Sequence, residues 1–348
     1  MQVMPFINDV LAANQERVAA SPTTRQSRFR FDPETMMARL HSRIIGQSAA
    51  LQEIGSSLQV IKAELGDPQR PLGTYLLLGP TGVGKTETVR LLAEAIHGGS
   101  EAYCRIDMNT LAQSHYAASL TGAPPGYVGS KEGTTLFDRE RIEGDYGRPG
   151  IVLFDELEKA DDQVIRALMN ILDNGQLRLS AGNGNLDFRN SLIFMTSNLG
   201  AGPHSKSARW LPRRLQLAQQ HRRQEAALGA RLDPEFINRI DHRIHYASLP
   251  RDQLEQLVDL ALARLNQRLG RHQVQLLLEQ SARQWLAQQG FDPRYGARAM
   301  ARTFRHHLEP AVAQCLLSAN GCPPGSLLRA SRNNAATRID ISLEAPDC

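Results

Sequence analysis

The stretch TYLLL-GPTGVGKT, at residues 74–86, decides the fold. Its first part, residues 74–78, is a short apolar run that predicts a buried strand. Its second part, residues 79–86, matches G-x-x-x-x-G-K-[ST], a glycine-rich turn whose backbone N–H groups can surround phosphate oxygens. Val89, Leu92 and Ile96 then recur at helical spacing. Strand, turn and helix in this order predict a phosphate-binding loop and make a chance match to the motif improbable.

Further strands and helices alternate on both sides of this loop. Ile106 falls in a second short strand, and the apolar runs 151–154 and 192–195 predict a third and a fourth. Their continuous apolar character is typical of strands covered on both faces. The alternation predicts an α/β fold with a parallel central sheet.

The chain length of 348 residues suggests about two domains. We expect an N-terminal helix and linker at 1–34, a large domain at 35–247 and a smaller domain at 248–348. Helical periodicity dominates after Leu249, and two short strands are expected at 327–330 and 339–343. The second domain is therefore predicted to be mostly helical.

Composition excludes several classes of protein. Hydrophobic residues make up 41% of the chain, enough for a core, and no apolar run has the length of a membrane helix. The net charge of +4 permits an acidic partner but does not require nucleic acid. No secretory signal is evident, and the cysteines lack metal-type spacing, since Cys315 and Cys322 are too far apart for C-x2-C. We expect a reducing, cytoplasmic location and no contact with a membrane.

A second motif lies about seventy residues after the loop. The apolar strand IVLF at 151–154 ends in Asp155 and Glu156. Carboxylates at the end of a buried strand are costly unless they meet a cation. Asp155 is expected to contact Mg²⁺ and Glu156 to activate the attacking water as general base. The alternative, a strand that simply leaves the sheet into a polar turn, is disfavoured by the preceding phosphate loop.

Together the two motifs predict a nucleoside-triphosphate hydrolase that uses Mg²⁺. Lys85 would reach the β- and γ-phosphates, and Thr86 would hold the metal ion. The residues expected to surround the phosphates are Gly79, Pro80, Thr81, Gly82, Val83, Gly84, Lys85, Thr86 and Glu87. These motifs do not say what hydrolysis drives.

Several further blocks resemble the AAA+ module of the Clp ring ATPases, most closely the second nucleotide-binding module of ClpB-type disaggregases. The resemblance covers residues 40 to 345. Its blocks are RIIGQ (43–47), GPTGVGKTE (79–87), RIDM (105–108), GAPPGYVG (122–129), LFDELEKA (153–160), DFRNSLIFMTSNLG (187–200), PEFINRID (234–241) and GFDPRYGAR (290–298). It implies an AAA+ ATPase domain with a small C-terminal lid.

The resemblance also implies roles for single residues. Asn198 matches sensor 1, which holds the attacking water. Arg239 matches the arginine finger, which reaches the neighbouring subunit's site, and Arg298 matches sensor 2. Ile44 and Ile45 match positions that pack against adenine. From the residues alone, Arg239 and Arg298 would be read as surface ion pairs.

Tyr127 and Val128 match the pore loop of the family. Six such tyrosines in a homohexamer would face a central channel and grip an extended polypeptide through packing. Without the resemblance, Tyr127 would be read as a residue that caps a loop. The loop continues with Ser130 and Lys131, where the family usually has another aromatic residue and an acid.

Other departures from the family bear on partners. The chain holds one ATPase module, and residues 182–184 lack the acid usual in the secondary pore loop. The stretch 199–231 offers no apolar-Gly-Phe/Leu tripeptide, so docking to a ClpP-type peptidase is not expected. Its basic residues, between Lys206 and Arg231, are read as a solvated helix with a flanking loop.

Three functional hypotheses follow. The leading one is an ATP-driven protein unfoldase or remodelling chaperone that acts as a hexameric ring on polypeptide clients. The alternative is an ATP-switched assembly or adaptor component that does not thread substrate. The third, a nucleic-acid motor or loader, rests only on the basic stretch and ranks last.

Overall fold

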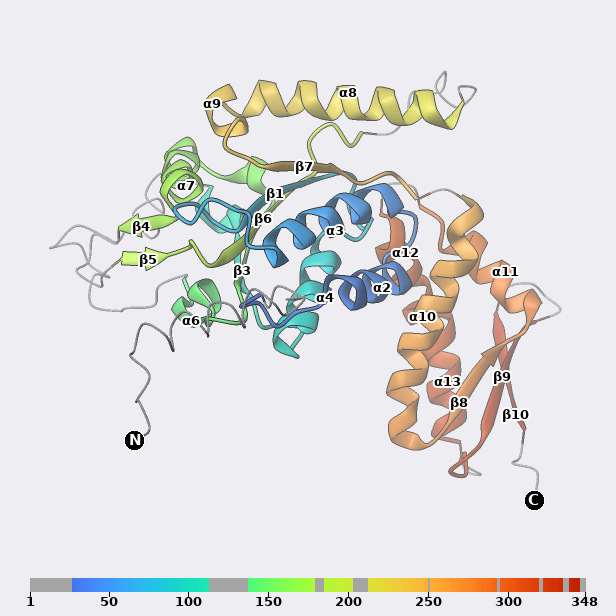
Figure 1. Ribbon diagram of the computed structural model, residues 1–348. Helices are drawn as coiled ribbons and strands as arrows, with labels where there is room; N and C mark the ends of the chain where they lie inside the picture. The colour runs from blue at the N-terminus through green and yellow to red at the C-terminus, as the bar shows by residue number, and fades with distance from the viewer. Residues whose placement is uncertain are drawn as a thin grey trace, which may run out of the picture.

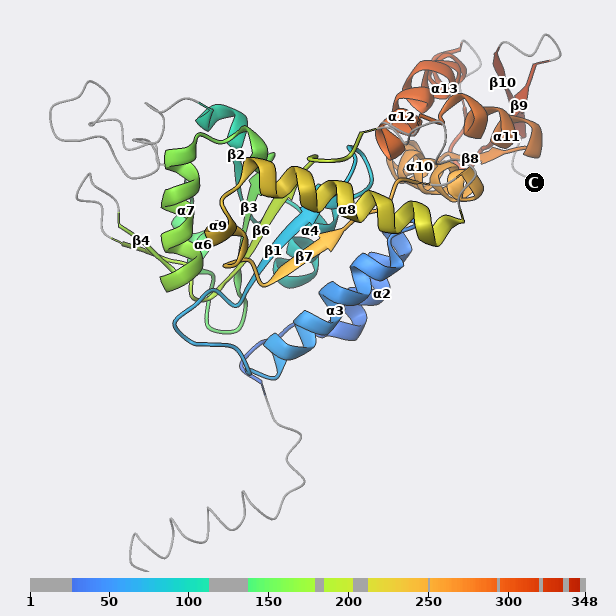
Figure 2. The same cartoon turned by 90° about the horizontal axis from the view of Figure 1, so that it is seen from above.

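The computed structural model describes residues 27–112, 137–178, 185–202, 212–249, 251–292, 295–318, 322–333 and 338–344. Within these ranges, a layered domain with a central sheet lies beside a smaller domain formed by the C-terminal part of the chain (Figures 1 and 2).

The described part of the larger domain is built on a parallel sheet with strand order β2-β3-β6-β1-β7. The strands are β1 (Gly73–Leu78), β2 (Cys104–Asp107), β3 (Gly150–Asp155), β6 (Ser191–Ser197) and β7 (His242–His245). Leu76 and Leu78 of β1 join one hydrophobic core, whereas Tyr75 and Leu77 join the other. The sheet is thus covered on both faces, which confirms the reading of the continuous apolar runs.

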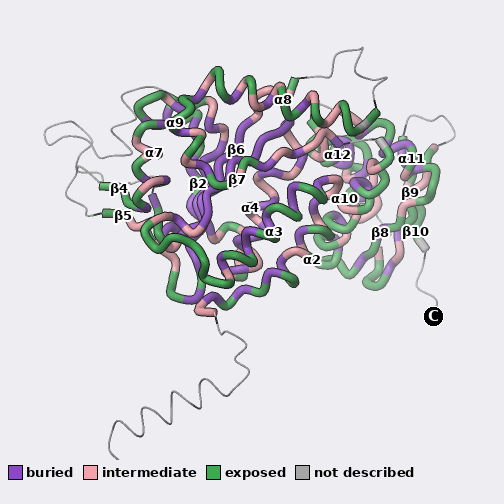
Figure 3. Tube along the Cα trace, turned by 45° about the horizontal axis from the view of Figure 1, so that its top comes forward, coloured by how far each residue is buried: buried purple, intermediate pink, exposed green. Residues whose placement is uncertain are grey.

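Helices cover the two faces of this sheet (Figures 1 and 2). One face carries α2 (Pro33–Arg43), α3 (Ser48–Lys62) and α4 (Lys85–His97). The other carries α6 (Arg139–Glu143), α7 (Asp162–Asn174), α8 (Arg213–Arg231) and α9 (Pro234–Ile237). The chain also forms the 3-10 turns η1 (Met108–Leu111) and η2 (Leu157–Lys159) and the hairpin β4 (Gln176–Arg178) with β5 (Asn185–Asp187). Figure 3 shows the buried strands between helices whose outer sides are exposed.

Side-chain caps mark the start of α2 and α7. The carboxylate of Asp32 accepts a hydrogen bond from the backbone N–H of Thr35 at the start of α2, and Asp161 accepts one from Gln163 at the start of α7. Such caps satisfy backbone donors that have no partner within the helix.

The segment before α2 differs from the expected linker. Phe29 and Phe31 are buried in the same core as α2 and α3, and the backbone N–H of Arg30 donates to the carbonyl of Gly147. Both aromatic rings remove a large apolar area from water, so the end of the 1–34 segment is part of the large domain rather than a linker.

The smaller domain has its own core, whose buried residues begin at Leu249. This separation supports the boundary that we propose near residue 248. Its elements are η4 (Arg251–Gln253), α10 (Leu254–Leu269), η5 (Gly270–His272), β8 (Gln275–Leu278), α11 (Gln280–Gln289), α12 (Gly296–Thr303), the π-helical turn η6 (Phe304–Leu308), α13 (Glu309–Leu316), β9 (Leu327–Arg332) and β10 (Ile339–Glu344). The strand order is β10-β9-β8. The two expected strands are present, and β8 was missed because four residues between helices carry little pattern.

The basic stretch forms α8 between Arg213 and Arg231. Its buried residues are Gln220, Gln224 and Leu228, which are four positions apart and so lie on one face of the helix. Most of its other described residues are at least partly exposed. None of the helices in the described residues combines the length and the apolar character needed to cross a bilayer.

Candidate active site

The loop between β1 and α4 is shaped by glycines at positions where a side chain would not fit. Gly82 has φ +77° and Gly84 has φ +112°, both in the left-handed region that favours glycine. A Cβ on Gly82 would lie 2.0 Å from the carbonyl oxygen of Tyr295 in the small domain. The loop therefore passes close to the small domain just before α4 begins at Lys85.

Lys85 points back into this loop. Its Nζ donates to the carbonyl oxygens of Gly79 and Pro80 at 2.6 and 2.8 Å, and to Oδ1 of Asn198 at 2.9 Å. Burial lowers the pKa of Lys85 to about 8, although nearby carboxylates, led by Glu158, favour the charged form. A buried ammonium held by neutral acceptors is a ready partner for a phosphate oxygen.

Asp155 and Glu156 stand at the carboxyl end of β3. Oδ1 of Asp155 accepts from the Thr196 hydroxyl at 2.5 Å, and Oδ2 pairs with the Arg105 guanidinium at 2.6 Å. This carboxylate thus already attracts a cation. Together with the hydroxyl of Thr86, which lines the same cavity, it offers the oxygen ligands that Mg²⁺ prefers.

Glu156 adopts a backbone conformation that is unusual for its residue type. Its φ and ψ are 61° and 53°, in the left-handed region, which costs about 1–3 kcal/mol for a residue other than glycine. Its N–H donates to Oγ1 of Thr196 at 3.0 Å, and its Oε2 accepts from Nδ2 of Asn109 at 2.7 Å. These bonds hold the carboxylate at the cavity, where it can accept a proton from water.

Asn198 follows the end of β6 and joins the two motifs. Its Oδ1 faces Lys85, while Glu158 accepts from its backbone N–H at 3.1 Å. Oε2 of Glu158 is buried with no hydrogen-bond partner among the described residues. Polar ends of β1, β3 and β6 therefore converge at one edge of the sheet, where ligands of open α/β sheets bind.

These residues surround a cavity of about 520 Å³ between the two domains. Ile44 is buried and Ile45 partly buried, and both line the cavity with Leu249 and Leu257 of the small-domain core. The cationic lining residues are Arg43, Lys85, Arg90, Arg105, Arg264 and Arg298, and the acidic ones are Glu87, Asp107, Asp155 and Glu156. The apolar part suits a base, and the excess of cations suits a polyphosphate.

Two polar contacts connect the domains beside the cavity. The backbone N–H of Ala297, next to Arg298, donates to the carbonyl of Gly82 at 2.9 Å. Arg264 of α10 contacts Oε1 of Glu87 of α4 at 2.6 Å. Burial opposes ionisation of Glu87, yet its pKa is lowered because its hydrogen bond from Arg90 and the charge of Arg264 outweigh that effect. The charged form of Glu87 thus connects the two sides of the cavity.

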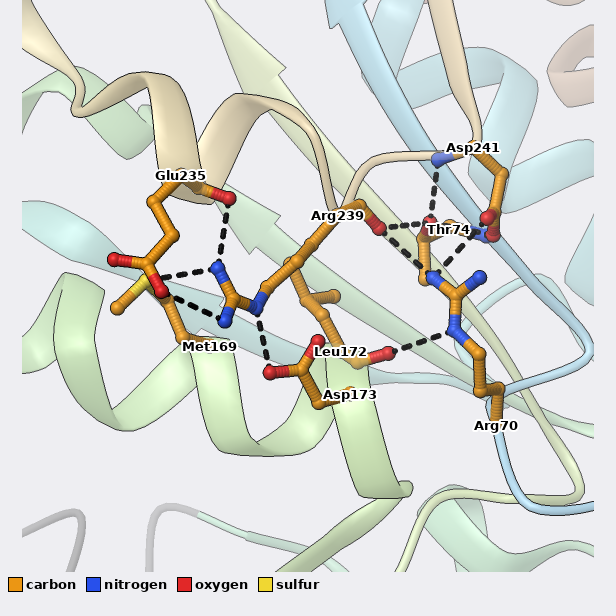
Figure 4. Close-up of polar contacts among 8 residues, drawn as sticks. All are labelled: Arg70, Thr74, Met169, Leu172, Asp173, Glu235, Arg239 and Asp241. Carbon is orange, nitrogen blue, oxygen red and sulfur yellow. Dashed lines mark hydrogen bonds and ion pairs between the residues drawn. The ribbon is translucent and has the colours of Figure 1, made fainter.

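Arg239 lies elsewhere (Figure 4). Its Nε donates to Asp173 at 2.5 Å, its Nη2 pairs with Glu235 at 3.0 Å, and its backbone carbonyl accepts from Arg70 at 3.0 Å. It does not line the cavity. The neighbouring Asp241 bonds to Thr74, at the amino end of β1, so Arg239 sits at the opposite end of this strand from the phosphate loop.

The structure thus brings residues 81–87 and the two carboxylates together with Asn198, Arg298, Ile44 and Ile45 around the cavity, and it separates Arg239 from them. Gly79 and Pro80 do not line the cavity, but their carbonyl oxygens contact Lys85. Tyr127 and Val128 lie outside the described residues. Sequence reasoning missed Asn109, Arg105 and Thr196. Asn109 lies two residues after the end of β2, the strand that pairs with β3, and a polar residue so close to that strand end was the available signal.

Comparison with known proteins agrees with this geometry. Residues 70–243 match the AAA domain (Cdc48 subfamily), and residues 249–327 match the C-terminal, D2-small domain, of ClpB protein. The chain is 50% identical over 344 residues to the ATP-dependent protease ATP-binding subunit-like protein AmiB of Pseudomonas aeruginosa, covering 90% of this chain and 93% of that protein.

Two other relatives extend the comparison. The ATP-dependent protease ATP-binding subunit-like protein of Rhodococcus erythropolis is 43% identical over 327 residues, covering 90% of this chain and 92% of that protein. Chaperone protein ClpB of Propionibacterium freudenreichii is 36% identical over 315 residues, covering 89% of this chain but 34% of that protein. The chain therefore spans about a third of the length of this ClpB relative.

A parallel sheet, a phosphate loop after β1 and two adjacent carboxylates at the end of β3 define a P-loop ATPase. The chain belongs to the AAA+ ATPases of the Clp family and contains one module of the type found as the second module of ClpB. It binds nucleotide and hydrolyses ATP.

Proposed function

We propose that this ATPase is a remodelling chaperone in which ATP hydrolysis pulls on polypeptide within a hexameric ring. The observation that carries the proposal is the assembled cavity, in which Lys85, Glu156 and Asn198 meet although they come from three strand ends. The relatives are named as a ClpB chaperone and as ATP-dependent protease ATP-binding subunit-like proteins, which supports a role in protein quality control.

In this mechanism, Lys85 exchanges its carbonyl partners for phosphate oxygens, and Arg298 approaches the same phosphates from the small domain. Thr86 and Asp155 would hold Mg²⁺, which supplies charge neutralisation for the phosphates. Glu156 removes a proton from the water that attacks the γ-phosphate, and Asn198 orients that water. Ile44 and Ile45 pack against the base.

Arg239 completes the site of the neighbouring subunit in this proposal. Its guanidinium would exchange Asp173 and Glu235 for the phosphoryl group of the next chain. Each active site would then need two chains, so ATP hydrolysis would depend on assembly.

The first experiment measures ATPase rate against protein concentration, with and without an unfolded protein such as casein. A ring that engages polypeptide gives a specific activity that rises with concentration and rises further with casein. Concentration-independent activity would contradict the two-chain site. Concentration dependence without a casein response would favour the switch hypothesis.

Replacing Tyr127 by Ala separates the two main hypotheses. A threading machine keeps its basal ATPase activity but loses the stimulation of that activity by casein and the unfolding of a tagged fluorescent client. The reason is that the aromatic side chain of Tyr127 grips the polypeptide. Tyr127→Phe is the matched control and should retain both. A component that uses ATP only as a switch would be indifferent to both changes.

We propose neither a ClpP-type peptidase nor nucleic acid as a partner, and a cytoplasmic location stays a prediction. Two relatives are named as protease ATP-binding subunit-like proteins, so the proposal that no ClpP-type peptidase binds needs its own test. ATP-dependent degradation of labelled casein on addition of a ClpP-type peptidase would show that such a peptidase is a partner and would contradict this proposal.

A further inference from the structure

A pair of cysteines meets in the small domain, away from the nucleotide cavity. Sγ of Cys315, in the last turn of α13, lies 3.6 Å from Sγ of Cys322, which precedes β9. Both are free thiols, and both side chains are partly buried against the small-domain core. The spacing C-x6-C is too wide for a metal-type motif, so only the fold brings the two sulfurs together.

We propose that Cys315 and Cys322 form a reversible thiol–disulfide site, oxidised by hydrogen peroxide and restored by small thiols. A disulfide has an S–S bond of about 2.05 Å, so the sulfurs must approach by roughly 1.5 Å from their contact distance. Leu317, which directly follows α13, is 86% exposed, so this end of the helix is open to small oxidants. The inference does not depend on the proposed function.

The two thiols have different parts in the reaction. Burial raises the pKa of the Cys322 thiol, and the adjacent Cys315 sulfur raises it further. A raised pKa leaves less thiolate on Cys322. We assign the first attack on peroxide to Cys315 because it lies in the last turn of α13, two residues before the exposed Leu317. Cys315 attacks one peroxide oxygen, forming a sulfenic acid and releasing water. The Cys322 sulfur then attacks the sulfenic sulfur and displaces a second water.

The reaction balances: two thiols and one hydrogen peroxide give one disulfide and two waters, and the peroxide takes up two electrons. The product closes a short loop between α13 and β9. Because α13 and β9 both contribute to the small-domain core, we expect the bond to stabilise this domain. Cys104 is buried in the large domain and is not expected to react.

Tryptic mapping of the full chain tests the proposal directly. Cleavage after Arg305 and Arg329 releases both cysteines in one peptide, 306–329. The reduced protein is treated with hydrogen peroxide, denatured, alkylated and digested without reductant. We expect the peptide to carry no alkyl groups and to be lighter than its reduced form by two hydrogens, and dithiothreitol to reverse this. Alkylation of both cysteines in that peptide would overturn the proposal.

Variants assign the two parts. In Cys322→Ser, a dimedone-type probe should trap a sulfenic acid on Cys315, and in Cys315→Ser the labelling of Cys322 should fall several-fold. Cys348→Ser is the matched control and should form the loop as the unchanged chain does. A disulfide from Cys348 to either partner in place of the 315–322 bond would contradict the inference. The oxidised chain should also melt roughly 2–5 °C higher, a difference that Cys322→Ser abolishes.

Discussion

Two polar clusters at opposite ends of β1 differ in how complete they are. The nucleotide cluster (Lys85, Asp155, Glu156 and Asn198) surrounds a cavity inside one chain. The Arg239 cluster (Arg70, Asp173, Glu235, Arg239 and Asp241) is satisfied by ion pairs at the other end of the strand. About five residues of β1 separate them, or roughly 17 Å. Arg239 is therefore too far from the phosphate loop of its own chain to contact phosphates bound there. A catalytic role for Arg239 requires the active site of a second chain.

The sharpest test of this difference is a mixture of two variants. Arg239→Ala should lower ATPase activity by about 10³-fold or more while nucleotide affinity stays unchanged, because an arginine finger stabilises only the transition state. Glu156→Gln should lower activity by about 10²–10⁴-fold through loss of the base. Mixed, the two variants recover activity at interfaces that combine an intact Glu156 with an intact Arg239.

Arg189→Ala is the control for the mixing experiment, because Arg189 pairs with Asp187 on the surface. It should leave activity unchanged. If Arg239→Ala alone is fully active, the Arg239 cluster is structural, and the finger assignment is wrong. If mixing recovers nothing, the two clusters do not form a shared site.

The second test uses the titration of Lys85 in the nucleotide cluster. With a pKa of about 8, the free site loses its ammonium as pH rises through that value. Affinity for a fluorescent ADP analogue should therefore be constant below about pH 7 and fall by up to about tenfold per pH unit above about pH 8. Lys85→Arg should bind without this alkaline decline. An equal decline in both proteins would locate the titrating group elsewhere.

The smallest expected effect concerns the contact between the domains. Replacing Arg264 by Met or Glu87 by Gln should weaken nucleotide binding by about threefold to tenfold, because each breaks one partly exposed ion pair beside the cavity. The double variant should be no worse than the poorer single variant. Independent, additive losses in this double-mutant cycle would mean that Glu87 and Arg264 do not act together.

The sequence predicted the parts of the fold that depend on local pattern. The apolar runs 74–78, 151–154 and 192–195 predicted three strands of the sheet, since continuous burial leaves a continuous apolar signature. It missed β7, where His242, Arg243 and His245 surround one buried residue, Ile244. An edge strand that is partly exposed needs no apolar run, so its pairing with β1 was visible only in the fold.

The candidate site divides in the same way. The sequence by itself determined the phosphate loop and the acidic strand end, because glycine-dependent turns and buried carboxylates leave a fixed local spacing. Only the tertiary structure decided that Asn109 holds Glu156, that Cys315 meets Cys322 and that Arg239 pairs with Asp173 and Glu235 outside the lining of the cavity. Other elements lie along the chain between Asn109 and Glu156 and between Arg239 and its partner Asp173, whereas six residues separate Cys315 from Cys322. No local rule of backbone or side-chain geometry predicts any of these contacts.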